Sequence, residues 1–229
     1  DLMRIKSEAG DEVSIFGQYN TKDSVLQECI SRAIDSFINW ETGECRFDSQ
    51  EFIDMLKLAD SFPKEFNWDD YDYSEDYESD YSRIKSGKQL LMPYTISNFD
   101  DMQYLSALFD GDVSFIGYPS TTGNGNVFMT GNTLAISTAC KNTDAAWSFV
   151  REYLLEENQT TDWMYQFPTN RNSFNTMVKN AMTPEYNTDP ETGAQVEVPK
   201  STWWMDDNQS VDIMAMTQEQ YDTFLALYN

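Results

Sequence analysis

In the early part of the chain, apolar residues recur every three or four positions, a spacing that predicts amphipathic helices. One such helix follows the capping candidates Thr21 and Asp23, and its apolar stripe comprises Val25, Cys29, Ala33 and Phe37. A second helix is predicted to begin after Asp48, whose carboxylate would form a reciprocal capping box with Glu51. Its stripe comprises Phe52, Met55, Leu56, Ala59 and Phe62. Each helix therefore has one face to bury against a neighbour.

The middle of the chain alternates short apolar runs with helical patterns. After a helical turn that ends at Gly87, the predicted elements are a strand over 89–96, a helix over 98–109, a strand over 113–117, a Gly/Asn/Thr-rich loop over 120–126, a second strand over 127–137 and an amphipathic helix over 142–155. This order suggests a chain that leaves one lobe and enters another.

Towards the C-terminus, the pattern predicts a short helix over 173–182 and then a surface excursion or hairpin over 183–201. That excursion holds three prolines and a turn at 189–193. Thr217 and Gln220 resemble a capping box before a final helix over 218–227.

Composition narrows the class of partner. The chain has 229 residues, of which 40% are hydrophobic and 14% aromatic, and this content favours a folded protein over a disordered one. Its net charge of -24 makes nucleic acid and anionic membrane surfaces poor partners, because both need a cationic surface. A neutral ligand such as a sugar meets no such objection.

Histidine is absent from the sequence, which excludes Ser/His and Cys/His nucleophile pairs and the common zinc sites within this chain. Cys29, Cys45 and Cys140 have no metal-ligand spacing. The preferred interpretation of Cys29 is a buried free thiol on a helix face, and a disulfide with Cys45 is the alternative in an oxidising compartment.

An acidic, tyrosine-rich tract over 67–81 has no apolar periodicity. Three interpretations stay open: a solvated loop that runs into a helix, a tyrosine that faces a ligand, and a calcium site. The spacing of the carboxylates does not match an EF-hand loop.

Three stretches in the middle of the chain, 84–97, 112–137 and 141–159, closely resemble extracellular solute-binding proteins of ABC importers, family 1, the group that carries sugars and oligosaccharides. The resemblance extends upstream over 37–63 and downstream over 167–186, so it covers most of the chain.

The resemblance implies an α/β fold of the periplasmic-binding-protein type II class, represented mainly by its C-terminal lobe. Residues 1–126 and 161–229 would form that lobe, and 127–160 would be a crossover strand and helix of the N-terminal lobe. Members of the family are exported, so a signal or lipoprotein segment is expected, which residues 1–10 do not resemble. The chain is therefore expected to be a fragment of an extracellular, cell-surface-anchored or periplasmic protein.

The function that the resemblance implies is capture of a sugar between two lobes and its delivery to the membrane permease subunits of an ABC importer. The protein would be a monomer, with no cofactor, no metal and no catalytic residue. Two rivals stay open: a glycoside hydrolase, which needs a pair of carboxylates, and a noncatalytic glycan-capture module on the cell surface.

Sugar binding combines flat aromatic faces with polar groups for the hydroxyls. Trp203 and Trp204, followed by Asp206, supply both in one predicted loop, and one of the two indoles is as well explained by a core role. Asn39 and Trp40 lie at a predicted helix end, where the family commonly contacts ligand, although ordinary packing of Trp40 is the alternative.

Further candidates follow from the resemblance alone. The family stretch that begins with Gly-Lys ends in an aromatic platform, and its tryptophan would fall near Ser97, so Tyr94 or Phe99 is the expected substitute. Thr130 and Gly131 resemble the crossover segment that offers backbone groups to ligand, where glycine permits close approach.

Overall fold

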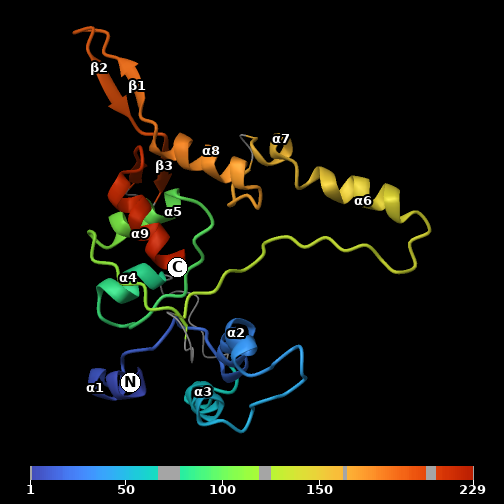
Figure 1. The fold of residues 1–229 in the computed structure, drawn as a ribbon. Coiled ribbons are helices and arrows are strands. Elements are labelled where there is room, and N and C mark those ends of the chain that lie inside the picture. Colours follow the sequence, from blue (N-terminus) through green and yellow to red (C-terminus); the bar gives the residue numbers. More distant parts are fainter. Residues whose placement is uncertain (1, 67–77, 119–124, 162–163, 205–209, 229) are drawn as a thin grey trace. The chain divides into compact units, whose positions relative to one another are not determined.

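The computed structural model describes residues 2–66, 78–118, 125–161, 164–204 and 210–228 (Figure 1). The chain divides into two compact units, which are considered separately. Unit 1 comprises Asp1–Tyr94 and Ser114–Phe128, and unit 2 comprises Thr95–Val113 and Met129–Asn229. The chain therefore passes from one unit to the other three times, after Tyr94, Val113 and Phe128.

Unit 1 is built on helices. They are α1 (Leu2–Ala9), α2 (Lys22–Ala33) with the 3-10 turn η1 (Ile34–Ser36), α3 (Gln50–Asp60) and α4 (Asp80–Lys85). The core is formed largely by α2 and α3, and its buried side chains are Ile15, Val25, Cys29, Ala33, Phe37, Met55, Leu58 and Ala59. The stripe predicted for the first helix is thus confirmed, as is its cap at Thr21.

The second helix differs from its prediction at the cap. The side chain of Ser49, not that of Asp48, accepts from the backbone N–H of Phe52 at 3.3 Å, so the helix begins one residue later than expected. Leu58 is buried, whereas Leu56 is 40% exposed. Serine and aspartate are equally good caps, so spacing alone could not choose between them.

Parallel pairing joins two distant segments of unit 1. The backbone N–H of Ser14 donates to the carbonyl of Lys88 at 2.9 Å, and that of Leu91 donates to Ile15 at 2.9 Å. The apolar run over 89–96 therefore pairs only at its start. The strands predicted over 113–117 and 127–137 are not strands in the described residues, because a strand needs a ladder partner.

Tyr118 attaches its segment of unit 1 to α2. Its hydroxyl donates to Glu28 Oε1 at 3.1 Å, and the guanidinium of Arg32 lies 4.4 Å from the centre of its ring. Burial raises the pKa of Tyr118 to about 12. The backbone of Gly125 packs directly against that of Tyr118. A Cβ at position 125 would lie 2.0 Å from the carbonyl oxygen of Tyr118, so only glycine fits there.

Unit 2 holds the remaining helices and two small antiparallel sheets. The helices are α5 (Asp100–Leu108), α6 (Thr143–Glu152), α7 (Glu156–Gln159), α8 (Arg171–Met182) and α9 (Gln218–Tyr228). One sheet pairs β1 (Glu185–Thr188) with β2 (Gln195–Val198), and the other pairs β3 (Ser201–Trp204) with β4 (Ser210–Ile213). The structure is thus a mixture of helices and small sheets, compatible with an α/β fold.

The helix predicted over 142–155 is shorter than expected, because α6 ends at Glu152. Thr217 and Gln220 form the predicted capping box of α9, with bonds of 2.9 and 3.2 Å. Asn142 caps α6, because its side chain accepts from Ala145 N at 3.1 Å. The excursion over 183–201 contains the β1–β2 hairpin, which confirms the hairpin prediction.

An aromatic core lies between α5, α8 and α9. Phe99 is 2% exposed, and its ring centre lies 5.0 Å from Phe167 and 5.1 Å from Phe224. Met216, which precedes α9, is also buried in this cluster. The core brings the C-terminal helix against α5, which also carries the β3–β4 hairpin.

Residues 127–160 expose an unusual amount of apolar surface. None of the α6 side chains is buried. The exposed large apolar residues of this segment are Val127, Phe128, Met129, Leu134, Trp147, Phe149, Tyr153 and Leu154.

All three cysteines are free, and Cys29 is buried, as expected. Burial raises the pKa of its thiol. In the part of the chain that the structure describes, no helix has both the length and the apolar character needed to cross a bilayer.

Candidate ligand-binding face

The β3–β4 hairpin has two chemically different faces. Trp203 pairs with Val211 and Trp204 pairs with Ser210 in an antiparallel register. Because successive strand residues point to opposite faces, one face carries Ser201, Trp203, Val211 and Ile213, which are buried or half-buried. The opposite face, called the outer face below, carries Thr202, Trp204, Ser210 and Asp212, all exposed.

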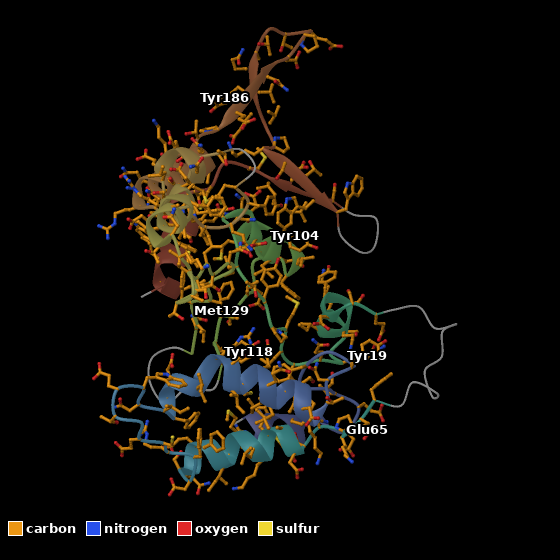
Figure 2. The ribbon with its side chains drawn as sticks, turned by 90° about the vertical axis from the view of Figure 1, so that its right-hand side faces the viewer. Tyr19, Glu65, Tyr104, Tyr118, Met129 and Tyr186 are labelled. Atoms are coloured by element: carbon orange, nitrogen blue, oxygen red, sulfur yellow. The ribbon has the colours of Figure 1, made fainter. Side chains whose placement is uncertain are left out.

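The inner face, which carries Ser201, Trp203, Val211 and Ile213, packs against side chains that lie on one side of α5. Tyr104, labelled in Figure 2, belongs to α5. The centre of its ring lies 5.2 Å from that of Trp203. Asp100 accepts a hydrogen bond from the hydroxyl of Ser201 at 3.3 Å. Ile213 is completely buried. Positions 100 and 104 lie on one side of a helix, so α5 acts as a base for the hairpin.

Gln103 adds a two-point clamp between the same elements. Its Nε2 donates to the carbonyl of Met214 at 2.9 Å, and its Oε1 accepts from the Met214 N–H at 3.1 Å. A side-chain amide thus replaces a neighbouring strand, so the backbone just after β4 has both of its polar groups satisfied.

Replacement of Gln103 by alanine is expected to lower the free energy of unfolding of unit 2 by about 1–2 kcal/mol, since two hydrogen bonds are lost and a backbone N–H loses its partner. Urea denaturation and hydrogen exchange at Met214 measure the effect. Gln218→Ala is the matched control, because the Gln218 side chain donates to Asp222 Oδ1 at 2.8 Å on the exposed side of α9. Its replacement should cost less than about 0.5 kcal/mol. Equal losses in the two variants would contradict the clamp.

Asp100 and Asp101 are occupied by structural roles in the first turn of α5. Burial raises the pKa of Asp100, while the hydrogen bond from Ser201 opposes that change. Asp101 Oδ2 accepts from Asn98 N at 3.1 Å, and Asn98 Oδ1 accepts from Asp101 N at 3.0 Å. These reciprocal bonds confirm that the two acids belong to a helix start.

The outer face combines an exposed aromatic ring with oxygen atoms that can form hydrogen bonds to hydroxyl groups of a ligand. Trp204 is 73% exposed. The hydroxyl of Thr202 donates to Asp212 Oδ1 at 2.9 Å, which orients the carboxylate. Ser210 lies directly across from Trp204. An indole face with two hydroxyls and one carboxylate is a combination that suits a sugar ring and its edge.

The structure thus separates the two indoles that the sequence proposed. Trp203 turns inward onto Tyr104, and Trp204 turns outward, because they are neighbours on a strand. The expectation that both lie in a loop was wrong, since they end β3. Asp206, the third candidate here, lies outside the described residues, as does most of the 67–81 tract.

Phe99 and Ser97 serve other purposes. The ring of Phe99 is enclosed by the aromatic core and is 2% exposed, so Phe99 is a core residue with no ring face open to a ligand. Ser97 donates its N–H to Asp101 Oδ2 at 2.6 Å and accepts from the Phe167 N–H at 3.0 Å through its carbonyl. Its backbone therefore holds the start of α5.

Asn39, Trp40 and Tyr94 belong to unit 1. Asn39 Oδ1 accepts from the backbone N–H groups of Glu41 and Thr42, at 3.0 and 3.2 Å, so its side chain shapes the turn after η1. Trp40 is 68% exposed, and its indole N–H donates to Asp35 at 2.6 Å. Tyr94 is 39% exposed.

Thr130 and Gly131 lie in an exposed part of unit 2 outside its helices and strands, with Gly131 at a bend. A Cβ at Gly131 would lie 2.7 Å from the side-chain oxygen of Gln166, so the glycine permits a close approach to protein at this point.

Three residues of the outer face were missed by sequence reasoning: Thr202, Ser210 and Asp212. The alternation that places them together was present, since Val211 and Ile213 are apolar on either side of Asp212. Four-residue strands are too short for such a pattern to stand out from a loop.

Within the described ranges, no three cysteine, aspartate or glutamate side chains gather closely enough to hold a metal ion.

Comparisons of the chain with models of protein families, with curated proteins and with solved structures returned no match.

Proposed function

We propose that this chain binds a sugar or oligosaccharide through the outer face of the β3–β4 hairpin. The observation that carries the proposal is the exposed indole of Trp204, held beside Thr202, Ser210 and Asp212 on a hairpin whose other face is fixed to α5. A rigid base reduces the entropy lost when an aromatic platform binds a ligand.

We further propose that the protein is an extracellular solute-binding protein that delivers its sugar to the permease of an ABC importer. Support comes from the resemblance of 84–97, 112–137 and 141–159 to that family. The apolar surface of 127–160 is consistent with this proposal, since a crossover segment of the second lobe would be covered by that lobe. The periplasmic-binding-protein type II fold and the three-part division of the chain belong to the same proposal.

A thermal-shift screen of the purified chain against mono- and oligosaccharides, with amino acids and peptides as other classes, tests sugar binding. A ligand that binds the folded state alone raises the melting temperature. We expect a response to at least one sugar and none to the other classes. If every sugar leaves the melting temperature unchanged, the proposal fails.

An assay for oligosaccharide hydrolysis distinguishes a solute-binding protein from a glycoside hydrolase. Incubation of the responding oligosaccharide with the protein should release no reducing ends. Release of reducing ends at a rate proportional to protein concentration would replace the transport proposal with the hydrolase.

A further inference from the structure

Asp212 is the charged residue of the outer face. It pairs with Thr202 across the hairpin, two positions along the strand from Ser210, the partner of Trp204. Such diagonal neighbours lie about 7–8 Å apart, within reach of a large side chain or of a group stacked upon it. A sugar ring on the Trp204 indole would therefore have an edge near this carboxylate.

Only one of the two oxygens of Asp212 is engaged within the described residues. Oδ1 accepts the hydroxyl hydrogen of Thr202 at 2.9 Å. Asp212 is exposed, so Oδ2 is the natural acceptor for a donor on a ligand. Carboxylates accept from hydroxyl groups and, more strongly, from ammonium groups.

The sequence around this face is rich in acids and poor in bases. From Ser201 to Asn229 there are five acids and no lysine or arginine, and Thr95–Val113, which includes α5, has four acids and no base. The neighbouring Lys200 is already engaged, since its Nζ lies 2.9 Å from Glu185 Oε1 and 3.2 Å from the carbonyl of Thr183. Proteins normally bind carboxylate or sulfate groups through arginine or lysine.

We infer that Asp212 sets the charge selectivity of the outer face, so that the ligand is a neutral or amine-bearing sugar and sugars with a carboxylate are rejected. The inference rests on the proposed sugar binding and adds the chemical class of the ligand. A hydroxyl or ammonium group at the ring edge donates to Asp212 Oδ2, while a uronate at the same place meets like charge, and the neighbouring Lys200 is held by Glu185.

Three gluco-configured sugars test this selectivity: glucose, protonated glucosamine, which differs from glucose at C2, and glucuronate, which differs from it at C6. Each is titrated into the ¹⁵N-labelled chain at low salt, and the indole N–H signal of Trp204 is followed by NMR after assignment with Trp204→Phe. We expect glucuronate to bind about two- to fivefold more weakly than glucose, and glucosamine to bind more tightly by a similar factor, as is usual for exposed charges.

Asp212→Asn keeps the shape and the acceptor for Thr202 but removes the charge, and should bring the three affinities together. Glu197→Gln is the matched control: it makes the same change of charge at an exposed position of β2, and should keep the wild-type order. Glucuronate that binds wild type as well as glucose does, or an order unaltered by Asp212→Asn, overturns the selectivity and leaves sugar binding intact. If none of the three sugars shifts the Trp204 signal, sugar binding at this face is itself refuted.

Discussion

Replacement of Phe99 by alanine is expected to lower the free energy of unfolding of unit 2 by about 3–5 kcal/mol, the usual cost of removing a buried aromatic ring from a core. The ring is 2% exposed and contacts aromatic residues from several elements, at centre-to-centre distances of 5.0 Å to Phe167, 5.9 Å to Phe174, 6.2 Å to Tyr221 and 5.1 Å to Phe224. Its loss leaves a cavity where α5, α8 and α9 meet. Urea denaturation followed by near-ultraviolet circular dichroism measures the change.

Phe149→Ala is the matched control for this loss. The Phe149 ring is 62% exposed on α6, and its centre lies 5.5 Å from that of Tyr153. The same substitution there should cost at most about 1 kcal/mol. A similar loss of unfolding free energy in the two variants would show that Phe99 is not the centre of a packed core. Phe99 would then again be a candidate ligand platform.

Helices were predicted well because their signals are local. Thr21 and Thr217 each lie directly before a predicted helix, and each caps the helix that was expected. The stripe from Val25 to Phe37 needs only one partner surface, which α3 supplies. Local capping and periodicity together fix such elements before any tertiary contact is known.

Strands were predicted poorly because a strand forms only when it pairs with another strand, and the apolar pattern of one segment does not identify that partner. The apolar run over 127–137 looks like a strand, yet no ladder is formed there in the described residues, so its apolar side chains stay exposed. The β3–β4 hairpin shows the reverse error. It was read as a loop, and only its register revealed that Trp203 and Trp204 face opposite sides.

The candidate site was therefore half predicted. Aromatic and acidic residues after position 200 pointed to the hairpin on which the site is proposed, and the adjacency of two indoles already suggested that one of them would have a structural role. Which one faces solvent depended on the contact of Trp203 with Tyr104, about one hundred residues earlier in the chain. Asp212 was not found, because a lone aspartate between apolar residues carries no signal until its strand partner Thr202 is known.

Replacement of Trp204 by alanine is expected to weaken binding of the responding sugar by more than about tenfold, while stability changes by less than about 0.5 kcal/mol. The indole is 73% exposed, so its removal costs little packing in the free protein. In the complex it is the one large flat apolar surface of the outer face, and truncation of such an aromatic anchor typically costs about 2 kcal/mol or more. Isothermal titration calorimetry with the sugar that gives the largest thermal shift measures the loss.

Trp40→Ala is the control for this prediction and also tests the alternative site. Trp40 is the other exposed tryptophan that the sequence proposed as a ligand contact, and it is 68% exposed in unit 1. Its removal should leave the affinity within about twofold of wild type, because an exposed indole outside the binding face contributes little. Trp203→Phe should likewise keep most of the affinity, since a phenyl ring preserves contact with Tyr104 and hence the position of the hairpin. If Trp40→Ala abolishes binding and Trp204→Ala does not, the ligand binds through unit 1, and the outer face of β3–β4 is a supporting surface with no part in recognition.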